Sequence, residues 1–85
     1  MNTYKSRQLS LLGKRVREFR TKLGISQEEL AFKAGMDRTY ISGVERGIRN
    51  PTYTSLATIA SALDSNVSDL LINIESLSNE QFSKE

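Results

Sequence analysis

Four apolar residues near the start of the chain recur at helical spacing. They are Leu12, Val16, Phe19 and Leu23. Intervals of four, three and four residues place these side chains along one face of an α-helix, and the glycine that follows is typical of a helix end. The pattern predicts a first helix from about Gln8 to Leu23. The opposite face of this helix is basic and carries Lys14, Arg15, Arg17 and Lys22.

A short second helix is predicted next, and a glycine ends it. Ser26 and Glu29 have the spacing of a capping box, in which each side chain satisfies a free backbone N–H at a helix start. The helix runs to about Ala34. Gly35 then permits the left-handed backbone conformation of a sharp turn, which costs other residues steric energy.

The third and fourth helices are predicted from their caps and apolar positions. Asp37 is the expected N-cap of the third helix. Gly47 and Pro51 end that helix, because proline lacks the backbone N–H that would continue it. Thr52 is the expected N-cap of the fourth helix. The inward-facing residues are Ile41 and Val44 in the third helix and Leu56, Ile59, Ala60 and Leu63 in the fourth.

A fifth helix is predicted to carry more aliphatic surface than a short terminal helix leaves in water. Asn66 and Asp69 have capping spacing at its start. Its apolar residues are Val67, Leu70, Leu71 and Ile74. Two interpretations stay open for this apolar face. It forms the interface of a homodimer, or it closes the core of a single small chain.

These elements predict an all-α fold with five helices in one compact domain over residues 12–71. Residues 1–11 are expected to form an N-terminal arm and the start of the first helix. Residues 72–85 are expected to form the end of the fifth helix and a polar tail. The 85 residues are enough for one small domain, which buries only a limited core and gains from a partner subunit.

Composition excludes several classes of function. The chain has no cysteine and no histidine, which removes the usual zinc ligands and imidazole acid–base catalysis. The acidic pair Glu28 and Glu29 is explained by its place at a helix start. We therefore expect no enzymatic activity, no metal and no cofactor. Because there is no run of about 18 apolar residues and the first ten residues are polar, we expect no membrane contact and a cytoplasmic protein.

The net charge of +2 conceals a segregation of charge along the chain. Residues 1–49 hold 11 Lys and Arg against 5 Asp and Glu, whereas residues 50–85 hold 1 against 5. A basic half of this kind favours a polyanionic partner over an evenly solvated surface, although only weakly.

The arrangement of the second and third helices adds a more specific signal. Two short helices joined by a tight glycine turn, in the middle of a string of five, are typical of a helix-turn-helix motif. Within residues 27–46, small Ala31 sits where the helices approach, Gly35 lies in the turn, and Ile41 and Val44 anchor the second motif helix. A pair of core helices without this function would rarely meet all four demands.

Two segments carry a resemblance to known proteins. QEELAFKAG at residues 27–35, with Ile41 and ERG at residues 45–47, resembles the Cro/C1-type (XRE-like) family of phage and bacterial repressors over about residues 12–71. DRTYISGVER at residues 37–46, followed by RNP at residues 49–51, most resembles the controller proteins of bacterial restriction-modification systems. The resemblance implies a dimer that regulates its own gene and that of the endonuclease.

The expected base-reading residues lie at the exposed start of the third helix, which enters the major groove in helix-turn-helix proteins. They are Arg38, Thr39 and Ser42. Arg38 can donate two hydrogen bonds to guanine O6 and N7, and Thr39 offers a hydroxyl and a methyl that suits thymine.

The residues expected to contact the DNA backbone or read its shape are Gln27, Tyr40, Arg46, Arg49 and Asn50. Gln27 lies in the first turn of the second helix, where backbone N–H groups favour a phosphate. Tyr40 has two open interpretations, which are contact with DNA and ordinary packing on the second helix. The glycine at position 43 is unfavourable inside a helix, and we expect it to permit close approach to DNA. The family resemblance further implies a structural ion pair between Arg20 and Glu45.

The functional prediction is a transcriptional regulator that binds a palindromic operator in double-stranded DNA as a homodimer. RNA polymerase is a candidate further partner. The alternatives are a phage-type repressor and a DNA-binding antitoxin that also binds a toxin protein. RNA binding is disfavoured because few aromatic residues are present to stack on bases.

Overall fold

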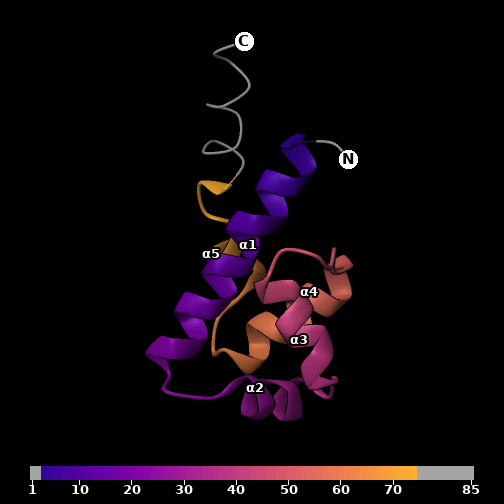
Figure 1. Cartoon of the computed structure of the whole chain (residues 1–85). Helices are drawn as coiled ribbons and strands as arrows, with labels where there is room; N and C mark the ends of the chain where they lie inside the picture. The colour runs from indigo at the N-terminus through magenta and orange to yellow at the C-terminus, as the bar shows by residue number, and fades with distance from the viewer. Residues whose placement is uncertain (1–2, 75–85) are drawn as a thin grey trace.

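The structure, a computed structural model, describes residues 3–74, and every regular element within this range is an α-helix (Figure 1). The elements are α1 (Thr3–Lys22), α2 (Gln27–Ala34), α3 (Arg38–Glu45), α4 (Tyr53–Ala62) and α5 (Val67–Leu71). The predicted all-α, five-helix fold is therefore confirmed. The predicted polar tail from residue 75 onward lies outside the described residues.

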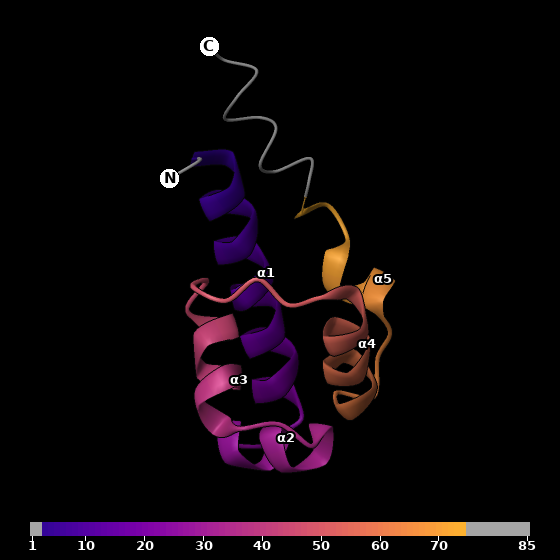
Figure 2. The same cartoon turned by 90° about the vertical axis from the view of Figure 1, so that its right-hand side faces the viewer.

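The first helix is longer than its apolar stripe indicates. α1 begins at Thr3, five residues before the predicted start at Gln8. The added turn is polar and contains no glycine or proline, so nothing stops the helix there and nothing apolar signals it. Figures 1 and 2 show this end of α1 extending past the body of the domain. At the other end, Leu23 lies just beyond the helix and is 40% exposed, so it is not part of the buried stripe.

Local capping explains where three of the other helices begin. The side chain of Ser26 accepts from the backbone N–H of Glu29 at 3.0 Å, and the Glu29 side chain accepts from the N–H of Ser26 at 2.8 Å. Asn66 and Asp69 form the same reciprocal pair at the start of α5, at 3.0 and 3.1 Å. Thr52 caps α4 by accepting a backbone N–H three residues later. These predicted caps are confirmed.

The turn between α2 and α3 has the predicted left-handed glycine. Gly35 has φ +66°, and the N–H of the next residue, Met36, donates to the carbonyl of Ala31 at 2.9 Å. The N–H of Gly35 also donates to the carbonyl of Phe32 at 3.2 Å, and the two bonds satisfy carbonyls in the last turn of α2. Asp37 occupies the N-cap position of α3 as predicted, but its side chain makes no capping hydrogen bond.

The five helices enclose one core. In Figure 2, α1 runs between α3 on one side and α4 with α5 on the other, and α2 lies across one end. The largest fully buried side chains come from all five helices and are Val16, Leu30, Ile41, Val44, Ile59 and Leu70. Within residues 3–74, no helix is both long enough and apolar enough to cross a membrane.

The short helix α5 is fixed to α1 by Arg15. One guanidinium nitrogen of Arg15 donates to the carbonyl of Asp69 at 3.1 Å, and the other donates to the carbonyl of Ile72 at 2.9 Å. Carbonyls at the end of a helix have no partner within the helix, so a cation there satisfies them and interacts favourably with the helix dipole. Arg15 was predicted only as part of the basic face of the first helix.

Candidate nucleic-acid interface

The outer face of α3 presents the three predicted base-reading residues. Arg38 and Thr39 are the first two residues of the helix and are exposed, and Ser42 follows on the same face, half-buried. Ile41 and Val44 point the other way, into the core. The apolar side of α3 therefore packs against the core of the domain, and the polar residues of its first turn stay at the surface.

Two further predicted contacts follow the end of α3. Arg46 is exposed, and its Nε donates to the carbonyl of Ser42 at 3.4 Å, which directs the side chain along the helix. Asn50 is exposed in the connection to α4. Both residues are on the surface next to α3, where the prediction of backbone contact requires them.

Tyr40 and Arg49 meet on the side of α3. The guanidinium carbon of Arg49 lies 5.5 Å from the centre of the Tyr40 ring, within the range of a cation–π interaction. Tyr40 is half-buried and packs partly against the core. The ring therefore belongs to the packing of the domain and also supports a cationic side chain at the surface.

The space at Gly43 has a different occupant from the one predicted. A Cβ built on Gly43 would lie 2.5 Å from Cγ of Arg49. The close neighbour of this glycine is thus the aliphatic stem of Arg49. The expectation that Gly43 permits direct approach of DNA is corrected accordingly.

The side chain of Gln27 is engaged within the protein. Its Nε2 donates to Oε1 of Glu45 at 3.0 Å. Contact with a phosphate stays a prediction, and it would use the second N–H of this amide together with backbone N–H groups in the first turn of α2.

Glu45 joins α1, the start of α2 and the end of α3. Its side chain is 1% exposed, and its two oxygens accept from Nε and Nη2 of Arg20 at 2.6 and 3.0 Å. Arg20 also donates to the carbonyl of Ile25 at 2.9 Å, and Arg17 lies 3.7 Å from the same carboxylate. The hydrogen bond with Glu45 raises the pKa of Arg20. The structure thus contains the ion pair that the resemblance implied, and it adds Arg17 and Gln27, which the sequence did not connect to it.

The apolar face of α5 is divided between the core and the surface. Leu70 and Ile74 are 0% and 4% exposed, so they have almost no surface left for a partner. Their assignment to a dimer interface is corrected, because they close the core of the single chain. Ile74 also lies beyond the end of α5. Leu71 and Ile72, at 42% and 53%, are the exposed aliphatic residues here, and Val67 is half-buried.

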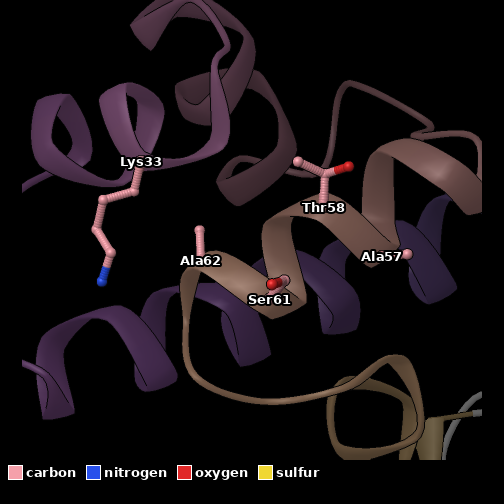
Figure 3. A pocket seen from close by; sticks show the side chains of 5 residues that line it. All are labelled: Lys33, Ala57, Thr58, Ser61 and Ala62. Carbon is pink, nitrogen blue, oxygen red and sulfur yellow. The ribbon is translucent and has the colours of Figure 1, made fainter.

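A hollow lies between α2 and α4 (Figure 3). It is lined by Lys33 from α2 and by Ala57, Thr58, Ser61 and Ala62 from α4. The hydroxyl of Thr58 donates to the carbonyl of Thr54 at 3.0 Å, within its own helix. These small side chains and one lysine bring together no set of groups for catalysis. Across residues 3–74, no three acidic side chains gather closely enough to hold a metal ion.

Comparison with known proteins agrees with this geometry. Residues 16–70 match the helix-turn-helix family HTH_3, and the chain belongs to this family. It is 44% identical over 71 residues to the control protein C.SmaI of Serratia marcescens, covering 84% of this chain and 83% of that protein. It is 45% identical over 62 residues to the control protein C.BamHI of Bacillus amyloliquefaciens, covering 72% and 76%.

A solved structure extends the similarity to three dimensions. The restriction-modification controller protein C.AhdI of Aeromonas hydrophila superposes with a TM-score of 0.72 at 48% identity, covering 73% of this chain and 94% of that one. The family and the similarity to controller proteins that the sequence predicted are both confirmed.

Proposed function

We propose that this protein is a sequence-specific DNA-binding regulator of transcription that reads the major groove with α3. The observation that carries the proposal is the polar first turn of α3, held at the surface by a buried carboxylate that ties the end of the same helix to α1 and α2. Arg46, Arg49 and Asn50 are exposed beyond the end of α3 and supply donors for the DNA backbone.

The regulator acts as a homodimer on a palindromic operator. Two copies related by a two-fold axis place their α3 helices in successive major grooves about 34 Å apart. Leu71 is the last residue of α5 and Ile72 follows it, and they form an exposed aliphatic pair that we assign to the interface. Leu71 lines a groove between α1, α4 and α5 together with Leu9 and Pro51, which allows the apolar contact to extend beyond one helix.

The biological role we propose is control of restriction-modification genes, including the gene of the protein itself. Its support is the similarity to C.SmaI, C.BamHI and C.AhdI, each described as a control or controller protein. RNA polymerase is the proposed further partner, since a bound dimer must either recruit it or block it to change transcription.

A nuclease footprint on the DNA upstream of the protein's own gene tests the role directly. At about 0.1 M salt with nonspecific competitor, one or two palindromes should be protected. Absence of protection by folded protein would contradict self-regulation and direct attention to the phage-repressor and antitoxin alternatives.

Arg38→Ala should flatten sequence preference at one symmetric base pair. Loss of two hydrogen bonds to guanine costs about 1–3 kcal/mol of discrimination, or roughly 5- to 150-fold. The measurement is the affinity of the variant for operators changed at each position in turn. Lys33→Ala is the matched control, since it removes one charge from α2 and should leave every preference unchanged. An unaltered profile for Arg38→Ala would remove that residue from base reading.

Leu71→Arg should separate the dimer while the chain stays folded. Burying an unpaired charge in an interface costs about 2 kcal/mol or more, which raises the dimer dissociation constant roughly 30-fold. Sedimentation equilibrium measures the constant, and circular dichroism checks the fold. Ser61→Arg places the same charge on the exposed side of α4 and should leave the dimer intact. Dissociation caused by Ser61→Arg but not by Leu71→Arg would place the interface at the hollow of Figure 3 instead.

A further inference from the structure

The side chain of Arg49 runs backward along α3. Arg49 follows the end of the helix, yet its backbone N–H donates to the carbonyl of Gly43 at 3.2 Å. Its guanidinium carbon lies 5.5 Å from the centre of the Tyr40 ring, which is one turn nearer the start of α3. The long side chain therefore crosses the surface of α3 from the end of the helix toward its first turn.

Gly43 makes this path possible. The three heavy atoms nearest to a Cβ built at this position are Cγ, Nε and Cβ of Arg49, at 2.5, 3.5 and 3.6 Å. A distance of 2.5 Å is shorter than two carbon atoms tolerate, and Cγ belongs to the stem of the side chain rather than to its free end. An alanine would favour the helix more than glycine does, so the missing side chain serves the placement of Arg49.

Tyr40 completes the support. Its ring is held by partial packing against the core, so it offers a fixed face to the guanidinium. A guanidinium held over an aromatic ring by its charge still has N–H groups to donate to other acceptors. Among residues 3–74 no carboxylate pairs with Arg49, so its charge stays available to an anion.

We propose that Gly43 and Tyr40 form a seat that orders Arg49 before DNA is bound, so that its guanidinium reaches the DNA backbone beside the base-reading turn of α3. The proposal rests on the proposed DNA-binding function. Gly43 and Tyr40 are positioning residues in this scheme and Arg49 is the contact. An ordered arginine binds more tightly than a free one, because less side-chain entropy is lost on binding.

A double-mutant cycle in DNA affinity tests the seat. The probe is a duplex carrying the DNA upstream of the gene, measured with wild type, Gly43→Ala, Arg49→Ala and the double variant. Each single change should weaken binding roughly tenfold, the effect of one charge-assisted contact. The double variant should bind no more weakly than Arg49→Ala alone, since Gly43 acts only through Arg49.

Arg46→Ala is the matched control for this cycle. It also removes an exposed arginine after α3, but its Nε bonds to Ser42 and its stem does not lie over Gly43. Gly43→Ala should therefore weaken binding by the same factor with and without Arg46. Losses at Gly43 and Arg49 that simply multiply would overturn the proposal.

Thermal unfolding without DNA tests the seat independently of the proposed function. Alone, Gly43→Ala should leave Tm unchanged or lower, because the methyl group collides with Arg49. In the Arg49→Ala background the same substitution should raise Tm by about 4–8 °C, since only the gain in helix propensity remains. An equal rise in both backgrounds would show that Arg49 does not rest on Gly43. If the wild type fails to bind DNA at all, the proposed function falls, and this measurement still decides on the seat.

Tyr40→Leu and Tyr40→Phe test the other half of the seat. Leucine removes the aromatic face, and it should make DNA binding insensitive to a further Arg49→Ala change. Phenylalanine keeps the face, and the loss caused by Arg49→Ala should persist in that background. Equal behaviour of the two Tyr40 variants would contradict a role for the ring in placing Arg49.

Discussion

Glu45→Ala is expected to lower the free energy of unfolding by about 3–5 kcal/mol. The substitution leaves Arg20, whose side chain is 12% exposed, without the carboxylate that binds two of its nitrogens. A buried cation without a partner is strongly destabilising, and small domains have only about 5–15 kcal/mol in total. Urea unfolding followed by circular dichroism measures the change.

Glu18→Ala is the control for this experiment. Glu18 lies 3.7 Å from Arg15 on the surface of α1, with its side chain 67% exposed. Exposed pairs of this kind contribute at most about 1 kcal/mol. A similar loss from both variants would show that burial of the Glu45 carboxylate does not govern its contribution.

The pH dependence of the Arg20 contribution has a defined sign. The hydrogen bond with Glu45 raises the pKa of Arg20 above its ordinary, already very high, value. The stabilisation from the arginine is therefore complete below that ordinary value and is lost only as pH rises through the raised one. Titration of Arg20 should therefore not alter the difference in unfolding free energy between wild type and Glu45→Ala from about pH 7 to pH 10.

Gly13→Ala is expected to destabilise the domain by about 2 kcal/mol, opposite in sign to its effect on an isolated helix. A Cβ at Gly13 would lie 2.5 Å from the carbonyl oxygens of both Val44 and Glu45. These are backbone atoms, so relief requires α1 to move away from α3. Overpacking of this kind costs about 1–3 kcal/mol and sometimes more, whereas alanine favours a helix by about 1 kcal/mol over glycine.

Lys14→Ala is the control that separates the gain in helix propensity at Gly13 from the collision with α3. Lys14 is the next residue of α1 and is exposed, so its change to alanine involves propensity without the collision. Thermal unfolding should show little change for Lys14→Ala and a large fall in Tm for Gly13→Ala. A Gly13→Ala variant more stable than wild type would contradict the close approach of α1 to α3.

The starts of α2 and α5 and the turn after α2 could be predicted, because the residues that form them are close together in the sequence. A capping box needs only two side chains three residues apart, as in Ser26 with Glu29 and in Asn66 with Asp69. The turn at Gly35 likewise depends on one residue. The start of α1 was missed because its first turn is polar and does not continue the apolar stripe.

The division of the α5 face could not be predicted from the sequence. Helical spacing groups Leu70 with Leu71 and Ile74 as apolar, but it does not show which of them the rest of the chain covers. The packing of α5 on α1 and α4 buries Leu70 and leaves Leu71 exposed. The choice between a core and an interface is made by that packing.

The all-α fold, the helix-turn-helix motif and the polar first turn of α3 could be predicted from the sequence, because each depends on residues within a few positions of one another. The packing of the helices was needed to show that Arg17 and Gln27 join the Arg20–Glu45 pair, and that Gly43 lies under Arg49. These contacts depend on distances between helices and on the path of a long side chain. Such quantities are set by the packing of the whole core and leave no periodic signal in the chain.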